Sequence, residues 1–146
     1  MMLLDREQIA ALIPHAGAMC LLDGLLQWDV SSIRCRSRRH LTIDNPLRRA
    51  GGLGALCGIE FAAQAMALHG RLATGAGEGP KAGYLASLRD VTCRRQRLDL
   101  LEGDLIIIAE RLAGDESQAL YRFAVECDGV ELLAGRAAVL LQVPPP

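Results

Sequence analysis

The segment Leu53–Leu72 constrains the fold more than any other part of the chain. It reads LGALCGIEFAAQAMALHGRL, in which alanine and other small residues dominate and charge is almost absent apart from Glu60. A helix that is apolar nearly all round is buried nearly all round. At the rise of an α-helix it spans about 30 Å, the width of a small domain. We therefore expect one central helix with the rest of the chain wrapped around it.

The rest of the chain is rich in strand patterns. A short helix from Asp5 to about Leu12 comes first, with Asp5 as its N-cap. Later, Asp128-Gly129 is a typical hairpin turn between alternating apolar runs. A curved antiparallel sheet of about five to six strands, wrapped around the helix, therefore gives an α+β fold in a single domain, residues 1–146. The predicted strands are Met19–Asp29, Ile33–Ile43, Gly83–Arg97, Asp104–Leu112, Leu120–Cys127 and Val130–Val143.

Charge and composition exclude several classes of protein. The formal net charge is −1, whereas a protein that binds duplex nucleic acid needs a basic footprint. No apolar run approaches the ~20 residues of a membrane helix, and the N-terminus lacks the pattern of a signal peptide, so we expect a cytoplasmic protein. The five cysteines are scattered without a Cys-x-x-Cys pair. Free thiols are expected, and neither a metal nor a cofactor is predicted.

Glu60 is the residue that points most directly to chemistry. An ionised carboxylate among apolar neighbours is costly unless it is paired, so these surroundings favour its protonated form. A carboxyl group that can hold or release a proton is what general acid–base catalysis needs. Gln64, one helical turn further on, could orient Glu60 or bind a substrate water. The alternative is a structural Glu60 that reaches solvent or bonds across a dimer interface.

Of the three histidines, His15 is the best placed for a site. It follows Pro14 in a loop between the first helix and the first predicted strand, and loops of this kind often carry functional groups. A histidine that only bonds a backbone carbonyl is the competing interpretation. His40 ends an arginine-rich strand, where we expect it to be exposed. His69 lies near the end of the central helix, where its positive charge would suit the helix dipole.

Two stretches carry a resemblance to a known family. They are IPHAGAMCLLD at Ile13–Asp23 and GIEFAAQAMA at Gly58–Ala67. Together they resemble the hot-dog fold β-hydroxyacyl-[acyl carrier protein] dehydratases, most closely the divergent branch of aryl-polyene-type pigment pathways. The resemblance implies a hot-dog fold, a homodimer or heterodimer, and dehydration of 3-hydroxyacyl chains. It implies Glu60 and His15 as catalytic residues, and Gln64, Pro14 and Gly58 as substrate-binding residues.

The chain departs from that family at one important point. The family's catalytic histidine lies in a Gly-His-Phe-Pro-Gly motif upstream of the helix, whereas residues 45–52 here read NPLRRAGG and contain no histidine. Three explanations stay open. His15 takes over the role, or a partner subunit supplies a histidine opposite Glu60, or the chain is a non-catalytic subunit that stabilises a catalytic hot-dog partner. A hot-dog acyl thioesterase is a further alternative, because that chemistry also uses a helix carboxylate.

Arginine is unusually common among the basic residues. Fifteen of the 16 are arginines, and three alternate along the predicted strand Ile33–Ile43. Substrates of the resembled family are carried on acyl carrier proteins, which are acidic, so arginine-rich faces could steer such a partner. A solvated sheet face is the competing interpretation. The two candidate surfaces are Arg34, Arg36 and Arg38, and Arg94, Arg95 and Arg97.

Overall fold

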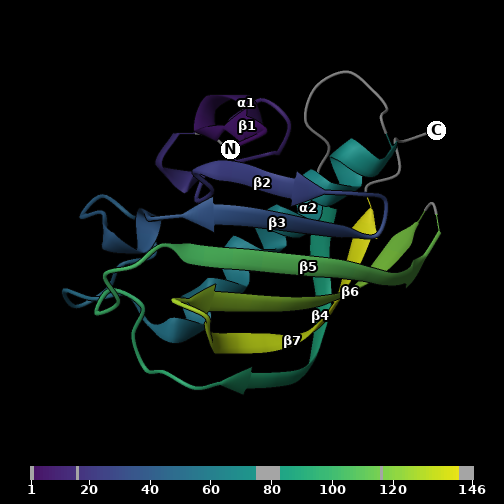
Figure 1. Ribbon diagram of the computed structural model, residues 1–146. Coiled ribbons are helices and arrows are strands. Elements are labelled where there is room, and N and C mark those ends of the chain that lie inside the picture. Colours follow the sequence, from purple (N-terminus) through teal and green to yellow (C-terminus); the bar gives the residue numbers. More distant parts are fainter. Residues whose placement is uncertain (1, 16, 75–82, 116, 142–146) are drawn as a thin grey trace.

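The computed structural model describes residues 2–15, 17–74, 83–115 and 117–141. Its strands form one antiparallel sheet in the order β1-β2-β3-β5-β6-β7-β4, with the long helix α2 (Gly58–Thr74) behind it (Figure 1). The sequence therefore predicts the α+β architecture correctly, although it misses the two-residue strand β1. The strands are β1 (Leu4–Asp5), β2 (Gly24–Trp28), β3 (Ser32–Ser37), β4 (Gly83–Cys93), β5 (Leu105–Gly114), β6 (Gln118–Cys127) and β7 (Val130–Leu141).

The first helix forms where the sequence predicts it. Helix α1 spans Arg6–Ala10, and the Asp5 side chain accepts a hydrogen bond from the backbone N–H of Gln8 at 2.9 Å. The Gln8 side chain accepts one from the backbone N–H of Asp5 at 2.9 Å in return, which completes a capping box. Two otherwise unpaired backbone donors are thereby satisfied, so this short helix starts at a defined residue.

The first two predicted strands are shorter in the structure than in the sequence analysis. Residues Gly17–Met19 form a 3₁₀ turn, and the extended ladder begins only at Gly24. At the other end, β3 stops at Ser37 and the chain turns through a second 3₁₀ segment, Arg39–Leu41. Leucine and arginine patterns continue through both turns, so the alternation of residue types did not reveal where the backbone leaves the sheet.

The central strands follow the predicted alternation. On β6, Tyr121, Phe123 and Val125 are buried, whereas Arg122 on the other face is exposed. The β6–β7 hairpin turns at Asp128 and Gly129, whose φ angles of 52° and 78° are the left-handed values that an Asp-Gly turn provides. This hairpin sets the register of the two strands, which pair from Cys127 with Val130 onward.

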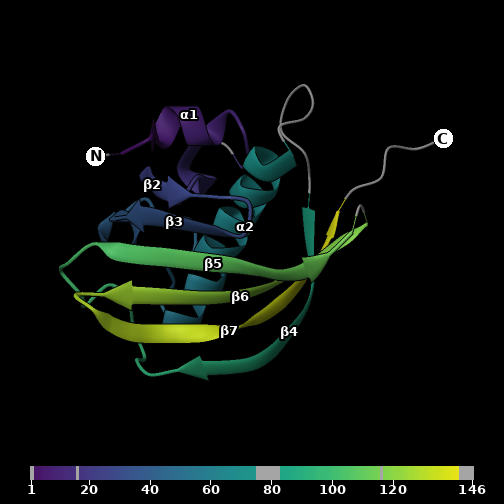
Figure 2. The same cartoon turned by 45° about the vertical axis from the view of Figure 1, so that its right-hand side comes forward.

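Helix α2 fills the concave side of the sheet (Figure 2). A 3₁₀ segment, Ala55–Cys57, leads into it. Its sheet-facing residues are buried, but the opposite face is not: Leu56 is exposed, and Glu60, Ala63, Ala67 and Gly70 are partly exposed. The expectation of burial nearly all round is therefore wrong for one face. None of the helices in the described ranges is long and apolar enough to cross a membrane.

The sheet ends at β4, which hydrogen-bonds only to β7. Side chains of its residues 85–90 are exposed on both faces, including Leu85 at 39% and Leu88 at 38%. Such an edge presents unpaired backbone donors and acceptors beside apolar side chains. Within the described chain, no strand pairs with the outer edge of β4.

Candidate active site

The structure brings His15 and Glu60 together. The Nε2 atom of His15 lies 3.2 Å from Oε1 of Glu60, and the two side chains are 24% and 36% exposed. Glu60 belongs to the first turn of α2, and His15 to the segment between α1 and Gly17. The fully apolar surroundings expected for Glu60 are not found, because it lies on the partly exposed face of the helix. The pair is therefore accessible to a ligand.

The two ring nitrogens of His15 differ in their surroundings. Nε2 faces Glu60, whereas Nδ1 is buried and has no hydrogen-bond partner among the described residues. Proton exchange with Glu60 or with a bound molecule therefore passes through Nε2.

Gln64 lies one turn beyond Glu60, but its amide faces the chain segment after His15. Its Oε1 accepts a hydrogen bond from the backbone N–H of Leu21 at 2.8 Å, and its Nε2 donates to the carbonyl of Met19 at 2.7 Å. The side chain is fully buried. Both polar ends of Gln64 thus link α2 to the segment that follows His15.

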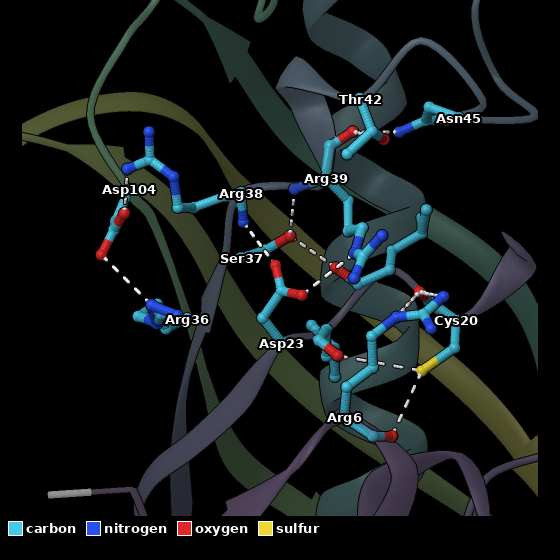
Figure 3. Close-up of polar contacts among 12 residues, drawn as sticks. Arg6, Cys20, Asp23, Arg36, Ser37, Arg38, Arg39, Thr42, Asn45 and Asp104 are labelled. Atoms are coloured by element: carbon cyan, nitrogen blue, oxygen red, sulfur yellow. Dashed lines mark hydrogen bonds and ion pairs between the residues drawn. The ribbon is translucent and has the colours of Figure 1, made fainter.

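Arg6 fastens the same segment from the other side. Its Nε and Nη2 atoms donate to the carbonyl of Cys20 at 3.1 and 2.9 Å (Figure 3). Nη2 also donates to the carbonyl of Gly17 at 2.5 Å. Sequence reasoning did not identify Arg6, because a single arginine in a short helix carries no motif. Its partners are backbone atoms, which leave no signal in the side-chain pattern.

The far end of the segment is fixed by β3 and the turn after it. The hydroxyl of Ser37 donates to the carbonyl of Leu21 at 2.5 Å. The carboxylate of Asp23 accepts from the backbone N–H of Arg38 at 2.6 Å and from Nε of Arg39 at 3.0 Å (Figure 3). Residues 17–23 form no strand, but hydrogen bonds hold them at several points. His15 lies just before this segment in the chain.

The other predicted site residues lie elsewhere. Pro14 is exposed and precedes His15 in the chain. Gly58 faces the sheet: a Cβ atom there would lie 2.9 Å from Cδ2 of Leu133 and 3.6 Å from Cγ2 of Val125. The absence of a side chain lets the start of α2 approach the sheet closely. Gly58 therefore packs on the side of the helix away from Glu60.

The two remaining histidines are buried and structural. His40 is fully buried, not exposed as expected, and its Nε2 donates to the carbonyl of Leu101 at 2.8 Å. His69 is also fully buried: the hydroxyl of Tyr121 donates to Nδ1 at 2.8 Å, and Nε2 donates to the carbonyl of Asp29 at 2.9 Å. Burial lowers the pKa of both histidines. The positive His69 expected at the helix end is therefore disfavoured.

Segment 45–52 adds no titratable ring near the pair. Asn45 is buried, and its side chain closes the turn by donating to the carbonyl of Arg39 at 2.8 Å and accepting from the N–H of Leu47 at 2.9 Å. Arg48 and Arg49 follow, and their guanidinium groups donate to backbone carbonyls of the same segment. Within the described chain, Glu60 therefore has one histidine beside it, His15.

The chain is similar to one protein family and to several solved structures. The model of the ApeP-like family, described as ApeP dehydratase, matches residues 7–144. The dehydratase heterocomplex ApeI:P from Xenorhabdus doucetiae is similar in structure, with a TM-score of 0.81 and 22% identity over 96% of this chain and 92% of that chain. No curated protein sequence matches the chain.

Thioesterase structures share the same architecture at lower similarity. A variant of a Pseudomonas aeruginosa thioesterase has a TM-score of 0.58 and 13% identity over 82% of this chain and 81% of that one. A variant of a Staphylococcus aureus thioesterase has a TM-score of 0.61 and 11% identity over 82% and 93%. At these identities the likeness concerns the fold alone, and it is the hot-dog fold that the sequence resemblance predicts.

Proposed function

The chain belongs to the ApeP-like dehydratase family, and from this premise we propose that it removes water from 3-hydroxyacyl thioesters as one subunit of a hot-dog dimer. The observation that carries the proposal is the contact between Nε2 of His15 and Oε1 of Glu60 on an accessible face of α2. Thioester dehydration needs one group that accepts a proton and one that donates a proton. This contact offers both in one place.

The reaction assigns one proton transfer to each member of the pair. One accepts the proton from C2 of the substrate, and the other donates a proton to the hydroxyl group on C3. The C3–O bond breaks, water leaves, and the electron pair of the C2–H bond becomes the C2–C3 double bond. The total charge of the pair is unchanged. Because Nδ1 of His15 is buried, its transfers pass through Nε2.

The partly exposed face of α2 supplies a place for the acyl chain. Ala63, Ala67 and Gly70 continue from Glu60 along that face, and all three are partly exposed. A Cβ atom at Gly70 would meet nothing within 4 Å. A row of small residues beside an acid–base pair fits an elongated acyl chain whose thioester end lies at Glu60. In this proposal an acyl carrier protein delivers that chain.

A second hot-dog subunit would complete this site. Strand β4 has a free edge and exposed leucines, which suits pairing with the edge of another sheet. The absence of a histidine from residues 45–52 also favours a partner that brings one. The related Xenorhabdus doucetiae protein is a dehydratase heterocomplex, so the proposal favours a heterodimer over a homodimer.

A double-mutant cycle on the pair tests the chemistry. We would assay Glu60→Gln, His15→Ala and their combination, alone and with a hot-dog dehydratase subunit that has a Gly-His-Phe-Pro-Gly motif, by ultraviolet absorbance of the enoyl thioester. Each single change should lower kcat by about 10²–10⁴-fold. The combination should be no worse than the poorer single variant, because groups that act as a unit are not additive. Glu110→Gln is the control, since Glu110 is 51% exposed on β5.

The same assay separates the alternatives. Full activity of the complex with both substitutions would overturn the catalytic role and identify a non-catalytic stabilising subunit. Release of free thiol in place of an enoyl product would identify a thioesterase.

Light scattering of Leu88→Lys tests the partner surface. The charged side chain at the β4 edge should reduce the dimer to a monomer, and an unchanged molecular mass would rule this edge out as the interface.

A further inference from the structure

Five arginines from two distant segments gather at one end of the molecule. Arg48 and Arg49 precede α2, whereas Arg94, Arg95 and Arg97 follow β4; we call these five residues the arginine cluster. The backbone joins the two segments, because the N–H of Ala55 donates to the carbonyl of Gln96 and the N–H of Leu98 to that of Leu53, both at 2.9 Å.

Side-chain positions confirm that the two segments are adjacent. The Nη2 atom of Arg48 donates to the carbonyl of Gly51 at 3.1 Å. On the neighbouring residue, a Cβ atom at Gly52 would lie 2.7 Å from Nη2 of Arg97. Guanidinium groups that are far apart in sequence therefore cover consecutive residues of one loop. Of the two segments of the cluster, only the one with Arg94, Arg95 and Arg97 is a candidate surface in the sequence alone.

Most of this positive charge is not neutralised. Arg97 pairs closely with Asp99, and Nε of Arg94 lies 3.7 Å from Oε2 of Glu131. The other three guanidinium groups hydrogen-bond only to backbone carbonyls within the described chain, which leaves their charge uncompensated. These three are Arg48, Arg49 and Arg95.

The alternative arginine face on β3 is different. Arg36 and Arg38 share the carboxylate of Asp104, at 3.6 and 2.5 Å (Figure 3). Paired surface charges of this kind contribute little to the field that an approaching molecule meets. On that face, Arg34 has no carboxylate partner among the described residues. The structure therefore favours the arginine cluster over the β3 face as a surface for an acidic partner.

The shape and position of the cluster suit a protein partner. A hollow of about 490 Å³ lies beside it, lined by residues 93–97 and by Leu100 and Leu101. Leu100 is 67% exposed, so an apolar contact stands among the arginines. The hollow also adjoins the segment that leads into α2, because Gln96, one of its lining residues, accepts a hydrogen bond from the N–H of Ala55 at 2.9 Å. A partner seated there would lie beside the segment that precedes α2, five residues before Glu60 in the chain.

We propose that the arginine cluster and its hollow dock the acidic surface of the acyl carrier protein, with Leu100 as the apolar contact. This inference rests on the proposed function, because it is the carrier that delivers the acyl chain to Glu60. Docking of this kind accelerates association and weakens with salt. The chain as a whole has a net charge of −1, so the attraction is local to this end of the molecule.

The test reverses the charge of one arginine in each of the two segments of the cluster. We would compare Arg48→Glu/Arg95→Glu with the wild type and with Arg34→Glu, an exposed arginine on β3, in the complete dimer. Each protein is assayed with a 3-hydroxyacyl group on the carrier protein and on N-acetylcysteamine, which has no charge to dock. The double variant should lose about tenfold or more in kcat/KM for the carrier substrate. Turnover of the N-acetylcysteamine thioester should be unchanged, and Arg34→Glu should match the wild type on both.

A direct measurement of carrier binding distinguishes docking from catalysis. Fluorescence anisotropy of labelled carrier protein should show binding that the double variant weakens and that salt weakens in the wild type. If the wild type binds the carrier but turns over neither substrate, the proposed function fails and the docking surface stands. Equal losses in Arg34→Glu, equal losses on both substrates, or unchanged carrier binding in the double variant would each overturn the docking proposal. A short DNA duplex that binds as tightly as the carrier would also overturn it, because the surface would then be a general anion site.

Discussion

The two faces of α2 use polar residues in opposite ways. On the buried side, Gln64 and His69 have both of their side-chain polar groups bonded to named partners: the backbone of Met19 and Leu21 for Gln64, and Tyr121 with the carbonyl of Asp29 for His69. On the partly exposed side, His15 is the one polar partner of Glu60 among the described residues, and Nδ1 of His15 has no hydrogen-bond partner among them. The polar groups on the buried face are all bonded within the protein and stabilise the fold. Those on the partly exposed face can still bind a ligand or exchange a proton with it.

This difference separates stability from function along a single helix. Burial of an unpaired polar group costs free energy, so every polar atom on the buried side needs its partner. On the exposed side water or a ligand can satisfy the group, so an incomplete set of bonds is tolerated there. Substitutions on the two faces should accordingly change different measured quantities, and four experiments test that expectation.

The largest effect on stability is expected at Gln64. Gln64→Leu leaves the N–H of Leu21 and the carbonyl of Met19 without their partners, and Leu21 is fully buried. We expect the free energy of unfolding to fall by about 2–4 kcal/mol, measured in urea. A change below about 1 kcal/mol in Gln64→Leu would show that the two hydrogen bonds of Gln64 contribute little to the stability of the fold.

The second effect is a dependence of stability on pH through the buried histidines. Burial lowers the folded-state pKa of His69 and of His40. Above the unfolded pKa of about 6.5 both forms are neutral and stability is flat. As the pH falls below that value, the unfolded chain binds protons that the folded chain does not, so stability decreases.

Unfolding free energies between pH 7.5 and 5 measure this effect, with an expected slope of up to about 1.4 kcal/mol per pH unit for each histidine. The variant His69→Phe removes one titrating group, so the slope should become shallower. An equal slope in His69→Phe and the wild type would contradict the assignment.

The same contrast explains which features could be predicted from the sequence. Local patterns are sufficient to predict helix α2 and strands β5 to β7, and residue alternation also places the buried face of β6. The small apolar residues of α2 do not reveal that one face of the helix is partly exposed. Strand β1 has two residues, too few for a period to be recognised. The bracing by Arg6 and the close approach of Gly52 to Arg97 depend on backbone geometry between distant segments. His15 and Glu60 were identified as candidates by residue type and family resemblance, but their distance required the fold.

A smaller effect on stability is expected at Gly58, on the sheet side of the helix. A methyl group there would approach Leu133 to 2.9 Å in a closely packed region. Gly58→Ala should therefore lower the free energy of unfolding by about 1 kcal/mol, since overpacking outweighs the helix preference of alanine. Thermal unfolding measures the change. A gain in stability would show that Leu133 moves aside without cost, and that the helix does not need its close approach.

The smallest effect on stability, and of opposite sign, is expected at Gly70 on the exposed face. A Cβ atom there meets nothing within 4 Å, so Gly70→Ala should raise the free energy of unfolding by about 0.5–1 kcal/mol through backbone entropy alone. If the acyl chain lies along this face, the same methyl group stands in its path. The variant should then turn over short 3-hydroxyacyl thioesters as the wild type does, while kcat/KM for long ones falls several-fold. A uniform response to chain length would place the acyl chain elsewhere, because one methyl group at Gly70 distinguishes substrates only if they reach that far along α2.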